Sequence, residues 1–268
     1  MEENLVSVIM PTYNTGSILS ESIDSILCQT YKNLELIITD DKSDDSSTIS
    51  ILKAYERKDN RVKVIYLDSN HGAGYARNKA IETARGRYIA FCDSDDRWVA
   101  DKLEKQIALI KEKNCCLTYS SYIICNQDGT DTGIFIAPSI VTYGGMKRDD
   151  KIGCLTALYD TAFYGKFYFP LLRKRQDWAM FILLLEKCRK AYGLKEPLAY
   201  YRLRTDSLSS NKRSLVKFNI NVYHKVLGFS KLKSYLYFGF IFLPTYIIKT
   251  IKRKKDSHKF LSLKQNIT

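Results

Sequence analysis

The chain has 268 residues, of which 45% are hydrophobic and 26% are charged, and its formal net charge is +13. This composition predicts a globular protein of one large domain, or of two halves that share a core, and excludes a disordered or fibrous chain. Residues 1–200 contain 27 Lys and Arg and 27 Asp and Glu, whereas residues 201–268 contain 15 Lys and Arg and two acidic residues. We therefore expect a neutral body with a basic tail, which disfavours a nucleic-acid-binding groove over the whole protein.

The seven cysteines include no CxxC pair and no Cys/His cluster. An odd number without such a pattern favours free thiols in a reducing compartment over disulfides or a zinc site. The N-terminus has neither a basic segment nor a long apolar stretch, so it does not resemble a signal peptide. These features predict a cytoplasmic protein.

Short apolar runs alternate with helical patterns through the first half of the chain. Strands are predicted at 5–10 (ending at Pro11), 34–39, 62–67, 87–92 and 115–125, with a last strand-like piece at 199–204. Helices are predicted after Gly16, at 44–57, through Ala80 and Ala84, at 100–113, and through Phe181 and Leu185. This alternation indicates an α/β fold with a largely parallel, doubly wound sheet.

Polar residues collect where the predicted strands end. Thr12, Tyr13 and Asn14 follow the first strand, Asp40 and Asp41 the second, and 93–96 the fourth. In such sheets ligands bind beyond the carboxyl ends of the strands, so these positions are candidates for a binding site. Helix caps and turns explain one such group, but not acidic groups after two strands that are expected to be neighbours.

Asp93 and Asp95 place two carboxylates two residues apart after an apolar strand. Hard divalent cations such as Mg²⁺ and Mn²⁺ prefer oxygen ligands, and Mg²⁺ is usually held by one or two carboxylates together with phosphate oxygens. A cation bound there would neutralise a diphosphate, which suits a reaction whose leaving group is a nucleoside diphosphate.

Three more residues fit a nucleotide. Asp41 has an acceptor for a base or ribose, Tyr13 has a ring that can stack on a base, and Arg77 has a guanidinium that suits a phosphate or the uracil region. The alternative for Arg77 is a solvated helix residue. Gly72 and Gly74 do not make a dinucleotide-binding motif, because the third glycine is absent and the pair follows the third strand.

Four segments of the first half resemble the signatures of family 2 glycosyltransferases with the GT-A fold. They are 6–14 (VSVIMPTYN), 37–46 (IITDDKSDDS), 74–78 (GYARN) and 91–96 (FCDSDD). They occur in order over roughly the first 105 residues, and their joint match is highly specific. One departure is Lys42, which stands where that family usually has glycine.

The resemblance implies an inverting transferase with a nucleotide-sugar donor, most often a UDP-sugar. By position in the motifs, Pro11, Tyr13 and Asp41 are expected to contact the nucleoside. Asp93 and Asp95 are expected to contact the ribose, the diphosphate and a divalent cation, Mn²⁺ or Mg²⁺, with Asp95 the direct ligand.

The segment Arg175-Gln176-Asp177-Trp178 resembles the acidic motif in the second half of that family, in which the Asp is usually the base. Inversion needs a carboxylate that takes the proton of the acceptor hydroxyl as this hydroxyl attacks the anomeric carbon. The alternative for Asp177 is a first-turn acid stabilised by the helix dipole. Trp178 is expected to be a core aromatic.

We divide the chain into a nucleotide-sugar-binding half at 1–105, an acceptor-binding half of the same domain at 106–205, and a tail at 206–268. In the tail, 234–248 is an uncharged run of 15 residues that contains Pro244 and is followed by Lys and Arg. A helix of that length measures about 22 Å, whereas the hydrocarbon core of a bilayer is about 30 Å thick, so a transmembrane span is disfavoured. An apolar aromatic segment beside a polybasic patch favours binding to an anionic membrane surface over packing on the domain or a dimer interface.

The sequence therefore predicts a metal-dependent inverting glycosyltransferase on the cytoplasmic face of a bacterial inner membrane. We expect it to move a sugar to a glycan or lipid-linked acceptor in surface polysaccharide biosynthesis. One alternative is a nucleotidyltransferase on a related fold, which would need a glycine-rich phosphate loop that 11–16 does not supply. The other is a non-catalytic nucleotide-sugar-binding or scaffold protein.

Overall fold

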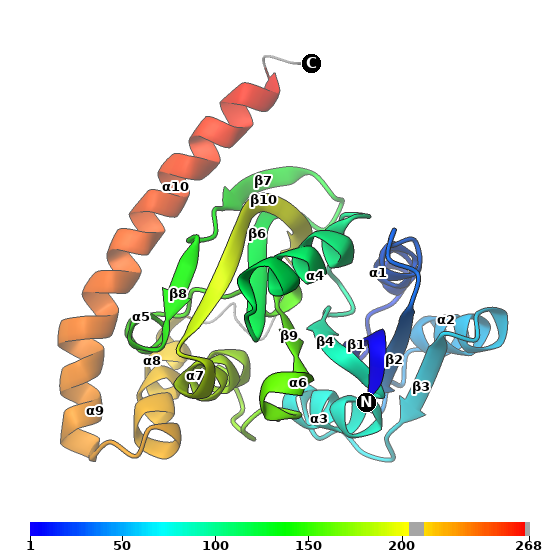
Figure 1. The fold of residues 1–268 in the computed structure, drawn as a ribbon, viewed down its shortest axis with the longest axis horizontal. Helices are drawn as coiled ribbons and strands as arrows, with labels where there is room; N and C mark the ends of the chain where they lie inside the picture. Colours follow the sequence, from blue (N-terminus) through cyan, green and yellow to red (C-terminus); the bar gives the residue numbers. More distant parts are fainter. Residues whose placement is uncertain (204–211, 266–268) are drawn as a thin grey trace.

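A ten-stranded mixed sheet runs through the protein, with helices on both of its faces (Figure 1). The computed structural model describes residues 1–203 and 212–265. The strands are β1 (Glu2–Thr12), β2 (Leu34–Asp40), β3 (Val62–Tyr66), β4 (Gly86–Phe91), β5 (Arg97–Trp98), β6 (Leu117–Cys125), β7 (Asp131–Phe135), β8 (Ile140–Thr142), β9 (Leu158–Asp160) and β10 (Lys190–Arg202).

Helices precede or follow most of these strands, as the alternating pattern predicts. The α-helices are α1 (Ile18–Leu27), α2 (Ser46–Lys58), α3 (Ala73–Thr83), α4 (Lys102–Lys113), α5 (Tyr143–Arg148), α6 (Thr161–Tyr164), α7 (Gln176–Cys188), α8 (Lys212–Asn221), α9 (Lys231–Tyr237) and α10 (Leu243–Gln265). Shorter turns are the 3₁₀-helix η1 (Cys154–Thr156) and the π-helical segments η2 (Val222–Val226) and η3 (Phe238–Phe242).

The sheet has a parallel half and a mixed half. Strands β3, β2, β1 and β4 lie side by side in that order and are all parallel, which confirms the α/β fold expected from the sequence. Beyond β4 the sheet is mixed, because β9 pairs antiparallel with both β4 and β6, and β6 then pairs parallel with β10. The strand predicted at 199–204 is the end of β10, and residue 204 lies outside the described residues.

Alternation along the buried strands builds a separate apolar core on each face of the sheet. In β1, Val8 and Met10 belong to the core on one face, and Ile9 belongs to the core on the other. This arrangement is why the strands read as unbroken apolar runs in the sequence. Strand β1 also continues past Pro11, where the sequence predicted its end. Pairing with β4 stops at Ile9, so the N–H that proline lacks has no partner to lose.

The buried carboxylate of Glu35 links strands β1, β2 and β3. Glu35 of β2 accepts hydrogen bonds from the Ser7 Oγ at 2.7 Å and from the Arg85 N–H at 2.8 Å, and Lys63 lies 2.9 Å away as its ion-pair partner. Burial acts to raise the pKa of Glu35, but these donors together lower it to about 2.

We expect Glu35→Gln to lower the free energy of unfolding at pH 7 by up to about 3 kcal/mol. A carboxylate whose pKa is lower in the folded state stabilises the protein above its unfolded pKa, and this contribution is lost as the pH falls from about 5 toward 2. Denaturant unfolding at several pH values checks this, and the wild type and the variant should converge in acid. The exposed Glu112→Gln is the matched control. A constant difference between wild type and Glu35→Gln across the pH range would contradict the ionic explanation.

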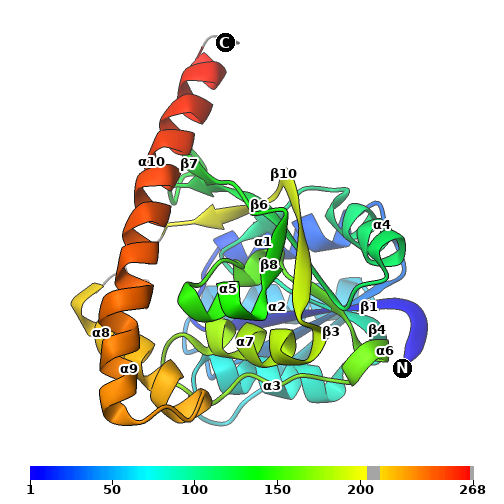
Figure 2. The same ribbon diagram turned by 60° about the vertical axis from the view of Figure 1, so that its left-hand side comes forward.

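After α8 and η2, the basic tail continues as one long helix that lies along the side of the body (Figure 1, Figure 2). Helix α9, η3 and α10 are continuous from Lys231 to Gln265. By length and composition this helix could cross a membrane, since an 18-residue window within it has a mean hydropathy of 1.2. Only 11% of that window is buried inside the protein. The sequence analysis disfavoured a span because of the shorter uncharged run and Pro244. The helix passes through Pro244 because the wider π-helical turn of η3 directly precedes it.

One face of the tail helix is fixed to the domain. Phe242 is buried in the core with Tyr246 against it, and the Lys249 ammonium forms an ion pair with the buried Asp149 at 2.7 Å. Further along, the Ser257 Oγ accepts a hydrogen bond from the Ile134 N–H of β7 at 3.0 Å. The packing alternative considered for the tail is therefore correct for this face of the helix.

Candidate active site

The acidic turn after β4 is tied to the loop after β1. The Ser94 Oγ lies 2.7 Å from the Thr15 Oγ1, which in turn lies 2.9 Å from the Thr12 Oγ1. The Ser22 Oγ of α1 donates to the Ser94 carbonyl at 2.8 Å. These side chains are buried, so the carboxyl edges of β1 and β4 are held together as one unit. The sequence analysis assigned no role to Ser94, although its place between two aspartates points to one.

Arg202, at the end of β10, anchors the same turn from the other side. Its N–H donates to the Asp96 Oδ1 at 2.9 Å and its Nε donates to the Asp95 carbonyl at 3.0 Å, while its guanidinium also pairs with Glu21. Asp96 is buried, and burial together with the charges of Asp95 and Asp93 raises its pKa well above the usual range. Sequence reasoning missed Arg202, because more than a hundred residues separate it from the turn.

The acidic turn fits a divalent cation. Asp93, Asp95 and Asp96 bring three carboxylates into four residues, and the buried Asp96 Oδ2 has no hydrogen-bond partner. Among the described residues no three His, Cys, Asp or Glu side chains are grouped so that they could enclose a metal ion. A cation at this turn would therefore take only one or two protein carboxylates, which is how Mg²⁺ is held when phosphate oxygens complete its coordination.

Arg77 links the acidic turn to the second half of the site. It lies on α3, forms an ion pair with the Asp93 carboxylate, and its guanidinium carbon is 5.2 Å from the centre of the Phe169 ring. Burial opposes its charge, but Asp93 and, more weakly, Asp177 raise its pKa above the usual range. The alternative of a solvated helix residue is wrong, since only 8% of Arg77 is exposed.

The residues predicted for the nucleoside lie next to each other at the ends of β1 and β2. The Asp41 N–H donates to the Thr12 carbonyl at 2.9 Å. Pro11 is buried, whereas the Tyr13 ring is 48% exposed just beyond the strand. The Asp41 carboxylate accepts backbone hydrogen bonds from 71 and 72, at 2.8 and 2.7 Å, and so also holds the loop before α3.

The backbone conformation at Lys42 explains why glycine is usual at this position in the family. Its φ is +67°, a left-handed conformation that glycine adopts without steric cost and lysine does not. The turn that follows β2 is nevertheless formed, and it keeps both preceding aspartates in place. The Asp40 Oδ2 accepts a hydrogen bond from the Ser43 N–H at 3.2 Å across this turn.

Asp177 lies in the first turn of α7, close to the donor-side residues. The N-terminus of α7 meets α3 at Gly74, where an added Cβ would lie only 2.6 Å from the Gln176 Oε1. The charge of Asp177 acts on Arg77 and on the buried Cys154. Trp178 is fully buried and its Nε1 donates to the Met146 carbonyl at 2.8 Å, so it is the core aromatic that was expected.

A second carboxylate lies beside Asp177. The Asp150 Oδ2 is 3.5 Å from the Arg175 Nη1, and the Asp150 carbonyl accepts a hydrogen bond from Lys249 of the tail helix. Burial, with a smaller effect of Asp177, raises the pKa of Asp150 to about 7. No local motif marks Asp150, so sequence reasoning missed it. The tail helix thus contacts the same cluster as the predicted base.

Fold and site together define an α/β transferase. An acidic turn suited to a diphosphate and a cation lies at the carboxyl edge of the parallel strands, and the charge of Asp177, in the first turn of α7, acts on the Arg77 that pairs with this turn. Residues 7–171 match the family described as "Glycosyl transferase family 2".

Named relatives and solved structures agree with this match. The chain is 45% identical over 223 residues to TuaG of Bacillus subtilis, a glycosyltransferase named for teichuronic acid biosynthesis, covering 83% of this chain and 88% of TuaG. It is 39% identical over 212 residues to WfgD of Escherichia coli, named a UDP-Glc:α-D-GlcNAc-diphosphoundecaprenol β-1,3-glucosyltransferase, covering 79% of this chain and 82% of WfgD. The structure of S. aureus TarS residues 1–349 with UDP-GlcNAc superposes with a TM-score of 0.69 at 23% identity, covering 88% and 73% of the two chains.

The chain therefore belongs to glycosyltransferase family 2 and is a glycosyltransferase. Its fold is that of the TarS structure, which confirms the fold class expected from the sequence. Neither the nucleotidyltransferase nor the non-catalytic alternative gains support from these relatives.

Proposed function

We propose that this glycosyltransferase moves a sugar, with inversion, from a UDP-sugar to a lipid-linked glycan acceptor in surface polysaccharide assembly. The observation that carries the proposal is the position of Arg77. It lies on α3 and pairs with Asp93 of the acidic turn. Gly74, one turn earlier on the same helix, lies against Gln176 beside Asp177, so α3 brings the donor-side acids and the candidate base near each other.

On the donor side, Asp95 and Asp93 would hold Mn²⁺ or Mg²⁺. The cation, when bound, neutralises the diphosphate as it leaves. Pro11, Tyr13 and Asp41 contact the nucleoside, with the exposed Tyr13 ring free to stack on the base. Arg202 keeps the acidic turn in the shape that this binding needs.

On the acceptor side, Asp177 accepts the proton of the attacking hydroxyl. It lies in the first turn of α7, and inversion requires that it act opposite the leaving diphosphate. The acidic turn follows β4 of the parallel half, and Asp177 lies on α7, which precedes β10 of the mixed half. This arrangement suits the division into a donor half at 1–105 and an acceptor half at 106–205. The boundary with the tail falls outside the described residues.

Two relatives support this choice of donor and acceptor. The printed name of WfgD gives UDP-glucose as donor and a diphosphoundecaprenol-linked sugar as acceptor, and the TarS structure contains UDP-GlcNAc. A mannosyltransferase of Pyrobaculum calidifontis, whose structure contains GDP-Man and Mn²⁺, has the same fold at a TM-score of 0.57.

Thermal stabilisation by a panel of UDP-, GDP- and CDP-sugars, each with Mn²⁺, tests the proposed donor. We expect a UDP-sugar to raise the melting temperature and to be hydrolysed slowly to UDP. Stabilisation only by a GDP- or CDP-sugar would contradict the UDP assignment. Failure of every sugar nucleotide to bind would contradict the function.

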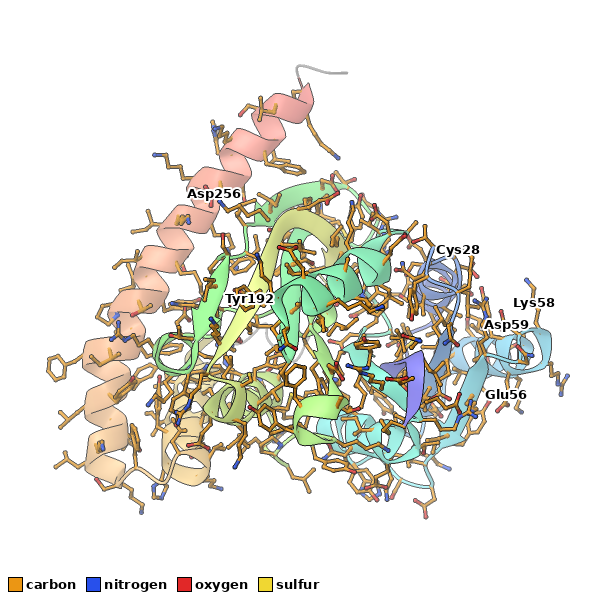
Figure 3. The ribbon with its side chains drawn as sticks, in the orientation of Figure 1. Cys28, Glu56, Lys58, Asp59, Tyr192 and Asp256 are labelled. Atoms are coloured by element: carbon orange, nitrogen blue, oxygen red, sulfur yellow. The ribbon has the colours of Figure 1, made fainter. Side chains whose placement is uncertain are left out.

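The tail helix supports a location at the membrane. Its exposed side carries large apolar residues spaced three or four apart, namely Leu232, Leu236, Phe240, Leu243, Ile247 and Ile251. The helix also holds nine Lys and Arg. Its one acidic residue is Asp256, which is labelled on α10 in Figure 3. Because its other face is bound to the domain, we propose that it lies on the cytoplasmic surface of the inner membrane and does not span it.

Replacing Phe240 and Ile251 together by Ser is expected to reduce sedimentation with vesicles containing anionic lipid at least about tenfold, since each buried apolar side chain contributes about 1.5–3 kcal/mol. Both residues are more than 60% exposed, so folding should be retained. Leu171→Ser, at an equally exposed leucine of the body, is the control and should sediment like the wild type. Unchanged sedimentation of the double variant would refute the membrane-facing role of this surface.

A further inference from the structure

A groove of about 540 Å³ lies between the tail helix and strands β6 and β10, next to the hydrogen bond that joins Ser257 to β7. Tyr122 and Tyr201, from β6 and β10, line its inner wall, and Arg253, Lys254 and His258 of α10 line its outer wall. Leu261 and Leu203 add apolar surface to its lining. We call this space the tail groove.

The charge of the tail groove selects an anion. Arg253 and Lys254 contribute two permanent positive charges, His258 adds a hydrogen-bonding ring, and no Asp or Glu is among its described lining residues. Its inner wall is aromatic and aliphatic, with the rings of Tyr122 and Tyr201 6.0 Å apart at their centres. Cations beside apolar surface suit a ligand that is anionic at one end and apolar at the other.

The tail groove adjoins the candidate active site. Burial raises the pKa of the Tyr122 hydroxyl, and the charges of Arg253, Asp150 and Asp96 all act on it. The Tyr122 ring is also so near Gly153 that an added Cβ would lie 3.0 Å from it. Through Tyr122 the tail groove therefore reaches the loop that carries Asp150 and Gly153, next to the cluster that contains the predicted base.

We propose that the tail groove binds the diphosphate of a lipid-linked acceptor, with Arg253 and Lys254 pairing to its phosphate oxygens. This assignment rests on the proposed function. The exposed apolar side of the same helix meets the membrane in that proposal, so a diphosphate at the bilayer surface comes within reach of these cations. The groove then presents the first sugar of the acceptor toward Asp177, while the acidic turn holds the diphosphate of the donor.

Calorimetric titration with octyl diphosphate in EDTA tests this assignment. Without a divalent cation the acidic turn repels an anionic probe, so binding reports the tail groove. We expect the wild type to bind octyl diphosphate more tightly than octyl sulfate, and Arg253→Gln with Lys254→Gln to raise Kd at least tenfold. Both residues are exposed, so the double variant should fold, which circular dichroism checks.

The matched control is Lys252→Gln with Lys255→Gln, which removes the same charge from the same helix outside the tail groove. We expect its Kd to stay within twofold of the wild-type value. An equal loss in both double variants, or no binding to the wild type, would overturn the assignment. If no nucleotide-sugar binds but octyl diphosphate still depends on Arg253 and Lys254, the proposed function fails and the anion site remains.

Discussion

Asp177→Asn is expected to lower kcat by about 10²–10⁴-fold, which is the usual contribution of a general base. The amide has nearly the same shape as the carboxylate but cannot take the proton of the acceptor hydroxyl. Donor binding should be close to that of the wild type, because the residues assigned to the donor lie in the first half of the chain and Asp177 lies on α7. Steady-state release of UDP gives kcat, and calorimetry with the UDP-sugar and Mn²⁺ gives donor affinity.

Asp150→Asn is the matched control, since it removes a second carboxylate from the same cluster. We expect it to lose less than about tenfold in kcat, because Asp150 contacts Arg175 and the tail helix and has no assigned part in proton transfer. Full activity of Asp177→Asn would remove Asp177 as the base. A large loss in Asp150→Asn with little loss in Asp177→Asn would transfer that role to Asp150.

The parallel half of the fold was predictable because its signals are local. Each of β1 to β4 is one apolar run followed by polar residues, and parallel strands bring those ends to one edge. The same logic placed Asp41 near the loop after β1, and the hydrogen bond from its N–H to Thr12 agrees with it. Lys42 shows the limit of a motif: a residue can depart from it while the backbone keeps the left-handed turn.

The mixed half was not predictable in this way, because its key contacts join distant residues. Arg202 reaches the acidic turn and Lys249 reaches Asp149 across about a hundred residues. No periodicity reports such pairs. The tail shows another limit of local signals: proline breaks a regular α-helix, but a π-helical turn beside Pro244 leaves this helix continuous.

The second large effect is expected from Asp95→Asn. Replacing a charged metal ligand by an amide should weaken cation binding, so kcat should fall by about 10²-fold or more and the Mn²⁺ concentration for half-maximal activity should rise about tenfold. The fold should be retained, because Arg202 is bound to this turn through the backbone carbonyl of Asp95, which the substitution keeps. Activity measured across a Mn²⁺ titration, after removal of bound metal with EDTA, checks both expectations.

Glu112→Gln is the control for Asp95→Asn, because it removes one acidic charge from the exposed C-terminal end of α4, and its metal dependence should equal that of the wild type. Comparing Asp95→Asn with Asp93→Asn then distinguishes the roles of the two aspartates in metal binding and donor binding. Asp93 is paired with Arg77, so its loss also frees a buried guanidinium and should weaken donor binding as well as the response to Mn²⁺. Full activity of the wild type in EDTA would exclude the metal-binding role of both aspartates, and the acidic turn would then have to act on the ribose alone.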